Sequence, residues 1–364
     1  MTWKTFAYLC VSCHFPQTFY DMTTYTEKLE KLKVPNPTLR DCFDPASSEF
    51  ADTTMEQKIA TLQKVIANGF SLQQLTTDYC KFYDKLNKPY VAKDLHQGLK
   101  TLINNLLQKH TSFKLKIVDD YSNEELLNAL TLLLKDTNVY AIEVKEIFYK
   151  HLVDKRKQYE YNDTEIFNPA ELNLAFDEHL NAWAYWHGNL NADILLIGQD
   201  FGDHAYYLNN DGKDEPRNAT NVNLACLFGE LGIDIGQSDD PNKDAKLYFT
   251  NAVLGVKKGG MAAPIKKSWY ADTAKKFIKP LIQLIEPKTI IAMGSKAYEV
   301  ISIIYNLDQK PMKDIVDNNP ILLDDNKKLF VVYHCSNLGI ANRNFNTQRE
   351  DWRKIKPYLD QNGS

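Results

Sequence analysis

Four polar segments in the C-terminal half of this 364-residue sequence follow short apolar runs and contain side chains that could do chemistry. They are Gly198–Asp200, Asn251, Gly294 and His334–Ser336. A carboxylate can stabilise positive charge or activate water, a carboxamide offers a donor and an acceptor, and a histidine can donate or accept a proton. Asp, Asn and Ser at such positions also serve as helix caps, so residue type alone leaves both interpretations open.

The apolar runs before these segments predict buried parallel strands. Each is short, unbroken and closed by polar residues, as expected of strands covered on both faces: ADILLIGQD, TIIAMGSKA and KLFVVYHCS. Helical patterns separate them, and a further strand, KLYFT, precedes Asn251. Alternating strands and helices predict a parallel α/β sheet with right-handed crossovers. Ligands bind beyond the carboxyl ends of strands in such sheets, so the four polar segments should face one crevice.

In the N-terminal half, the apolar residues recur with a different period. From Glu56 to about Tyr161, apolar residues recur at spacings of three and four, which predicts four to six amphipathic helices. Ser122 and Glu125 form a capping-box pattern at one helix start. A chain of this length suits two domains. We expect an all-α domain over residues 1–165 and, over 166–364, an α/β three-layer sandwich with a central, mostly parallel sheet.

Composition narrows the class of protein. A hydrophobic content of 44% and a charged content of 25% are typical of a globular chain, and the net charge of -4 gives no global nucleic-acid signature. Six irregularly spaced cysteines indicate reduced thiols and a cytoplasmic location. Cys10, Cys13 and His14 lack a second ligand pair at metal-site spacing, so no metal is expected. The apolar stretch Thr5–Phe15 is too short to span a membrane.

The sequences around the polar segments resemble the uracil-DNA glycosylase superfamily. The family's first motif, GQDPYH, reads GQDFGD here, from Gly198 to Asp203. Three further motifs, LLLNTVLTV, PKVIVALG and HPSPLS, correspond to residues Tyr248–Val256, Glu286–Ala297 and His334–Gly339. The four motifs keep the family's order and spacing over about 170 residues from Ala192 to the end, and the helical half shares none of the resemblance.

The resemblance implies a role for each of the main polar side chains. Breaking a base–sugar N-glycosidic bond builds positive charge on the sugar and negative charge on the departing base, and both must be stabilised. The family's pattern assigns Asp200 to the sugar and the attacking water, and His334 to the developing anion. Asn251 falls on the asparagine that recognises the base edge. Leu338 stands where a family leucine enters the duplex to hold the base out.

The resemblance also suggests further base-binding residues: Gln199, Phe201, Gly202 and Tyr206. Gly202 replaces the tyrosine that excludes 5-substituted pyrimidines in the GQDPYH enzymes, which predicts a more open pocket. No clear counterpart of the base-stacking aromatic is present, and Tyr206 or Tyr207 is the candidate.

A basic stretch after the second motif indicates a phosphate-bearing substrate. Its lysines surround a single acidic residue, Asp272: Lys257, Lys258, Lys266, Lys267, Lys275, Lys276 and Lys279. A solvated surface is the alternative explanation. We expect DNA contacts from Lys257, Lys258, Lys266 and Lys267, together with Ser336 and Leu338. The preference for single or double strands stays open.

Three functional hypotheses follow. The first is a monofunctional DNA glycosylase, without a cofactor, that acts on a flipped uracil or a 5-substituted pyrimidine. The second is a catalytically inactive nucleic-acid-binding module of the same fold, whose helical half binds a protein partner. The third, an unrelated nucleotide-binding or hydrolytic enzyme, is disfavoured because the sequence contains no GxxxxGK, GxGxxG or GxSxG motif. Only Cys226 and Cys335 lie in the α/β domain, so we expect no iron–sulfur cluster.

Overall fold

The computed structural model describes residues 54–74, 76, 91–109, 111, 113–115, 121–135, 142–172, 174, 179–183, 188–210 and 215–360. The chain forms two compact units, Met1–Val144 and Lys145–Ser364, which are considered separately. The stretch Thr5–Phe15 and the Cys10–His14 motif lie outside the described residues. Within the described residues, no helix combines the length and apolar character needed to cross a membrane. Nor does this part of the chain hold a group of three or more His, Cys, Asp or Glu side chains suited to a metal ion.

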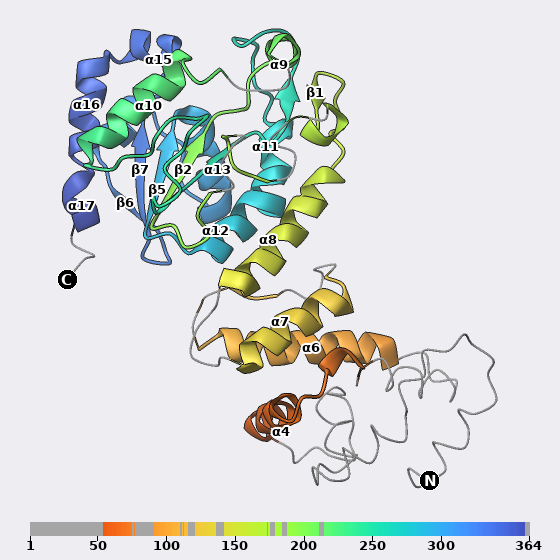
Figure 1. Ribbon diagram of the computed structural model, residues 1–364. Helices are drawn as coiled ribbons and strands as arrows, with labels where there is room; N and C mark the ends of the chain where they lie inside the picture. The colour runs from red at the N-terminus through yellow and green to blue at the C-terminus, as the bar shows by residue number, and fades with distance from the viewer. Residues whose placement is uncertain are drawn as a thin grey trace, which may run out of the picture. The chain divides into compact units, whose positions relative to one another are not determined.

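The first unit is helical where it is described (Figure 1). Its helices are α4 (Met55–Ala67), α6 (Val91–Leu107) and α7 (Asn123–Lys135). The capping box predicted at the start of α7 is present, because the Ser122 backbone N–H donates to Glu125 Oε2 at 2.6 Å and the Glu125 N–H donates to Ser122 Oγ at 3.2 Å. Contacts of α7 with α4 and α6 bury its leucines. The predicted helical N-terminal region is confirmed.

The division between the units lies about 20 residues before the predicted one. Helix α8 (Ile142–Lys157) begins at this division and packs mostly with the α/β unit. The Tyr149 hydroxyl lies 2.7 Å from the hydroxyl of Tyr248, and Arg156 Nη1 donates to Asn168 Oδ1 at 3.3 Å. The 3.6-residue period that predicted this helix carries no information on the unit against which it packs.

A five-stranded sheet forms the centre of the second unit, in the order β3-β2-β5-β7-β6. Four strands are parallel: β2 (Ile194–Gly198), β3 (Leu247–Asn251), β5 (Thr289–Met293) and β7 (Lys328–Val332). Strand β6 (Ile321–Leu322) pairs antiparallel with β7 at one edge. Every residue of β2, β3 and β5 is buried, as their unbroken apolar sequences predict. The expected mostly parallel α/β sheet is confirmed.

Helices cover both faces of this sheet and make three layers (Figure 1). On one face α10 (Ala219–Glu230) and α16 (Phe345–Arg353) share a buried core with β2, β3, β5 and β7. On the other face lie α11 (Ser268–Thr273), α12 (Lys279–Ile285) and α13 (Ser295–Tyr305). A π-helical turn, Ala274–Ile278, joins α11 to α12.

Short elements complete the unit. The helical ones are a 3₁₀ turn (Pro169–Leu172), α9 (His204–Asn209), α14 (Met312–Asp317), α15 (Asn337–Asn342) and α17 (Lys356–Asp360). Strand β1 (Ile166–Phe167) pairs antiparallel with β4 (Val256–Lys257), outside the main sheet.

The strand order places a crevice at the carboxyl ends of the parallel strands. From β2 the chain adds β3 on one side and then returns across β2 to add β5 on the other. Such a reversal is the usual ligand position in an open α/β sheet. The four polar segments predicted from the sequence lie at the carboxyl ends of β2, β3, β5 and β7 at this edge.

Candidate active site

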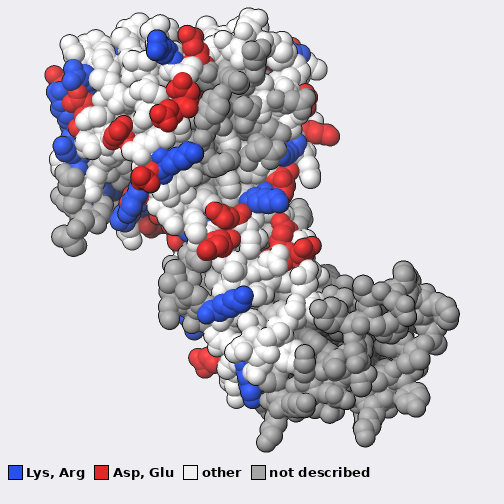
Figure 2. Space-filling view, in the orientation of Figure 1, with Lys and Arg blue, Asp and Glu red and all other residues white. Residues whose placement is uncertain are grey.

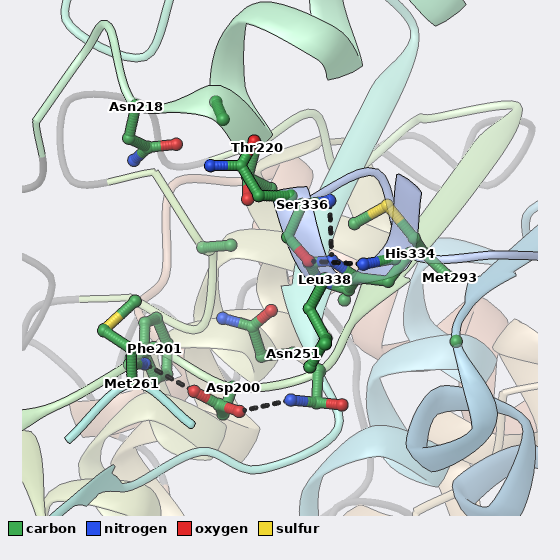
Figure 3. A pocket seen from close by; sticks show the side chains of 18 of the residues that line it. Asp200, Phe201, Asn218, Thr220, Asn251, Met261, Met293, His334, Ser336 and Leu338 are labelled. Carbon is green, nitrogen blue, oxygen red and sulfur yellow. Dashed lines mark hydrogen bonds between the residues drawn. The ribbon is translucent and has the colours of Figure 1, made fainter. Parts of the chain in front are cut away.

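A pocket of about 750 Å³ opens at the carboxyl ends of the parallel strands. This volume lies within the range of sites that bind small molecules. All four predicted polar segments contribute to its walls, through Asp200, Asn251 and His334 (Figure 3) and through Gly294. The structure therefore brings together, from separate strand ends, the carboxylate, the carboxamide and the imidazole that the sequence singled out.

Asp200 follows β2, and three donors fix its carboxylate. Oδ1 accepts the Gly202 backbone N–H at 2.6 Å, and Oδ2 accepts Gln199 Nε2 at 2.9 Å (Figure 3). Lys257 Nζ also donates to Oδ2, at 3.2 Å. A carboxylate has about four lone-pair sites, so roughly one remains for a ligand or a water molecule. Only 7% of the Asp200 side chain is exposed. The site thus presents a rigid anion at the wall of the pocket.

Lys257 is not on the surface where the sequence placed it. The residue is only 1% exposed, and its ammonium pairs with Oδ2 of Asp200 at 3.2 Å. Its position on β4, paired with Ile166 of β1, holds it in the interior. A run of lysines in a sequence does not reveal which member a strand will turn inward. The expectation that Lys257 contacts DNA is therefore corrected.

Asn251 is the last residue of β3 and is paired in register with Gly198 of β2. A Cβ atom on Gly198 would collide with the carboxamide oxygen of Asn251, so the glycine provides the space that this amide occupies. Phe249, two residues earlier on the same face of the strand, also lines the pocket. The carboxamide borders the cavity, where its donor and acceptor can both reach a ligand.

His334 follows β7 and is held through its Nδ1 atom. Nδ1 accepts the backbone N–H of Ser336 at 3.1 Å, so the neutral ring carries its proton on Nε2. Burial lowers the pKa of His334 below its ordinary value of 6.5; the negative charge of Asp200 opposes this effect and the positive charge of Lys257 adds to it. At neutral pH the side chain is therefore an uncharged donor through Nε2.

The turn after His334 depends on the residues that follow it. Ser336 caps α15, because its Oγ accepts the Gly339 N–H at 3.3 Å. A Cβ atom on Gly339 would overlap the carbonyl oxygen of His334, so this turn closes only with a glycine. Leu338, the predicted wedge, is 71% exposed at the border of the pocket (Figure 3).

The remaining predicted base-binding residues all line the pocket: Gln199, Phe201, Gly202 and Tyr206, with the alternative Tyr207. Phe201 is buried, and the Tyr206 hydroxyl accepts the Glu215 N–H at 2.6 Å. The space expected beside Gly202 is occupied, because a Cβ atom there would lie 2.9 Å from Sδ of Met261. Met261 itself is 59% exposed and borders the pocket (Figure 3).

Sequence reasoning missed several hydrophobic residues of the pocket, among them Trp183, Phe249 and Met261. Trp183 and Phe249 pack edge to face with their ring centroids 5.9 Å apart. The two-residue period of a strand would have placed Phe249 on the face of Asn251, so this signal was present in the sequence. Trp183 precedes all the motifs, and Met261 comes near Gly202 only through a loop.

The loop that carries Met261 is attached to the first motif. The Gly260 N–H donates to Asp203 Oδ1 at 2.9 Å, and the Asp203 side chain is also the cap of α9. Gly259 and Gly260 both have positive φ, at 88° and 92°, which glycine adopts readily. These contacts fix the approach of the loop to the pocket.

The other predicted DNA-contacting lysines differ in exposure. Lys266 and Lys267 are exposed, whereas Lys258 is half-buried with its Nζ 4.4 Å from the centroid of the Phe167 ring. Lys266 pairs with Asp163 at 2.8 Å, and the Lys266 and Trp269 donors lower the pKa of Asp163 to about 2. On the face shown in Figure 2, basic and acidic side chains of the described residues are interspersed. DNA contact by these lysines stays a prediction.

A family model matches the part of the chain that carries the pocket. Residues 185–356 match the family model described as the uracil DNA glycosylase superfamily. The matched segment contains β2, β3, β5 and β7 together with the four polar segments at their ends. No curated protein matches the chain.

Proposed function

Because residues 185–356 match the model of the uracil DNA glycosylase superfamily, we propose that this chain hydrolyses the N-glycosidic bond of a flipped uracil or 5-substituted pyrimidine in DNA. The observation that carries the proposal is the convergence of Asp200, Asn251 and His334 on one pocket. An anion, an amide and a neutral imidazole donor are the groups that this reaction needs around a base and its sugar.

Asp200 and His334 act on opposite charges in the transition state. The Asp200 carboxylate stabilises the positive charge that develops on the sugar, and its remaining lone pair can hold the attacking water. His334 donates through Nε2 to a carbonyl oxygen of the base as negative charge builds there. The restricted orientations of both groups mean that little reorganisation is required during the reaction.

Asn251 provides the recognition of the base. Its carboxamide can donate to a carbonyl oxygen and accept from a ring N–H of uracil, while the amino group of cytosine would face a donor. The buried backbone of β3 and the space left by Gly198 hold this amide in place. Leu338, exposed beside the pocket, is suited to fill the gap that a flipped base leaves in the duplex.

A catalytically inactive binding module is the second candidate, and one observation favours it. Asp200 is paired with Lys257, so part of its negative charge is already compensated in the unliganded site. A module of this kind would bind DNA and accept a flipped base without breaking the glycosidic bond. The presence or absence of an abasic product separates the two candidates.

The test uses the full-length protein and a panel of labelled oligonucleotides, single- and double-stranded, each with one uracil or one 5-substituted pyrimidine. Abasic sites are measured as strand breaks after alkali. We expect excision from at least one member, with breaks appearing only after alkali because the enzyme is monofunctional. Binding to the panel without any abasic product would refute the glycosylase proposal and support the binding module. Breaks without alkali would refute monofunctional activity.

A further inference from the structure

We propose that Lys257 is a positioning residue that fixes the Asp200 carboxylate and keeps His334 uncharged, although it touches no substrate atom. The kinetic part of this inference rests on the proposed glycosylase function. Its structural part does not, because both effects can be measured without a substrate.

The position of Lys257 excludes direct contact with a bound base or sugar. Its side chain is only 2% exposed, and it is not among the residues that border the pocket in the described part of the chain. The ammonium reaches Oδ2 of Asp200 at 3.2 Å, where Gln199 also donates. Lys257 therefore acts on the pocket through its pairing with the carboxylate and through its charge, and not by contact with a ligand.

The main chain places Lys257 with little freedom. Its backbone N–H donates to the carbonyl oxygen of Gly202 at 3.2 Å, and it forms a parallel bridge with Asp203. These contacts join β4 to the segment that carries Asp200. The same segment thus supplies both the carboxylate and the backbone attachment of its partner, which fixes the separation of the two charges.

Stability alone is a poor explanation for this buried pair. Taking two charges out of water is costly, and an apolar pair of similar volume often serves folding equally well. Losing only one partner is different, because it leaves an uncompensated buried charge. Without Lys257, the negative charge of Asp200 would have to find another partner in the pocket.

His334 lines the same pocket as Asp200, and the charge of Asp200 favours its protonated form, which makes it the candidate for that partner. Asp200 and Lys257 are the charged groups that act on the His334 ring, with opposite effects on its protonation. Removing Lys257 leaves Asp200 free to attract a proton to His334. A protonated ring would carry a hydrogen on Nδ1, directed at the Ser336 N–H that Nδ1 now accepts. The loss of Lys257 should therefore charge His334 and release it from the turn that holds it.

The experiment titrates His334 by NMR in the wild-type protein and in Lys257→Met, without DNA. We expect the midpoint of His334 to move to higher pH in the variant. In single-turnover excision, the acid limb of the pH–rate profile should also move to higher pH. The rate at neutral pH should fall about 10- to 100-fold, as expected for a misplaced catalytic group. Lys257→Arg keeps the positive charge and should retain the wild-type midpoint.

Lys145→Met is the matched control. Lys145 is also buried, but its Nζ donates to the carbonyl oxygens of Leu190 and Ile285. Its loss removes a buried lysine outside the pocket and should leave the His334 midpoint unchanged. A shift of equal size in the control would overturn the assignment to Lys257, as would an unchanged midpoint and a wild-type rate in Lys257→Met.

Two further measurements keep the test decisive. If Lys257→Met does not fold, Asp200→Asn/Lys257→Met is titrated against Asp200→Asn, since the double variant leaves no unpaired buried charge. The midpoint of His334 should still rise when Lys257 is removed, and no change overturns the inference. Borohydride trapping of a covalent complex through Lys257 would also overturn it, because the lysine would then contact the sugar. If the wild type excises no base, only the proposed function fails.

Discussion

A methyl group added at Gly339 should inactivate the site without contacting the substrate. In Gly339→Ala the new Cβ would overlap the carbonyl oxygen of His334, far inside the 3.0 Å below which Cβ contacts essentially do not occur. Because both partners are backbone, α15 or the His334 peptide must shift by more than about 1 Å, and a displacement of that size can cost about 100-fold in rate. Overpacking of this kind destabilises proteins by about 1–3 kcal/mol.

Gly229→Ala provides the matched comparison. Gly229 lies in α10 with open space around its Cβ position, so alanine should stabilise that helix by about 0.5–1 kcal/mol. The same helix preference favours alanine in α15. The overlap with the His334 carbonyl is the larger effect, so Gly339→Ala should lower the free energy of unfolding. Denaturant unfolding and single-turnover excision of both variants measure this difference. A Gly339→Ala protein with wild-type stability and rate would refute the packing deduced for the turn.

Three further predictions follow from the site. Met261→Ala should raise excision of a 5-substituted pyrimidine relative to uracil by about tenfold, because the Met261 side chain occupies the space beside Gly202. Excision rates measured in parallel on both substrates test this prediction, and an unchanged ratio of the two rates contradicts it. Replacing Lys258, Lys266 and Lys267 with glutamine should weaken DNA binding, and the slope of log affinity against log salt concentration should fall by about 0.9 for each phosphate that is no longer neutralised. Fluorescence anisotropy at several salt concentrations measures this slope, and an unaltered slope would mean that DNA binds elsewhere. The rate of excision should persist as the pH falls through 6.5 and decline only below it, since burial lowers the pKa of His334. A pH–rate profile whose acid limb has its midpoint at or above 6.5 would contradict the assignment of His334 as a neutral donor.

The sequence predicted the sheet and the main site residues because both leave local signals. Unbroken apolar runs identify β2, β5 and β7, and a polar stop after each run identifies the edge where a ligand would lie. Asp200, Asn251 and His334 all follow from this reasoning and the family motifs. Their positions depend on strand register, which the buried pattern specifies strongly.

The features that the sequence did not reveal depend on contacts between distant segments. Lys257 reads as one of seven basic residues, and only the pairing of β4 with β1 turns it toward Asp200. Met261 meets Gly202 through the attachment of Gly260 to Asp203, which has no local signature. Open space beside Gly202 was predicted because the tyrosine side chain of the GQDPYH enzymes is missing there. In the structure, Met261 from another segment occupies that space.

Gly202 is itself a poor position at which to test substrate range. Its φ of 95° belongs to a region that side chains rarely adopt, so Gly202→Tyr would strain the backbone next to Asp200. Loss of activity in that variant would not distinguish a blocked pocket from a displaced carboxylate. Substitutions at Met261 alter the same space from a flexible side chain, and they leave the first motif unchanged.

The most direct test of the catalytic assignment compares Asp200→Asn with the wild type on the best substrate of the oligonucleotide panel. Single-turnover excision and DNA affinity are measured on the same preparations. The substitution removes a charge needed in the transition state more than in the bound ground state, so the rate should fall by orders of magnitude while affinity stays nearly unchanged. Full turnover by Asp200→Asn would contradict the account, because the chemistry would then depend on another group.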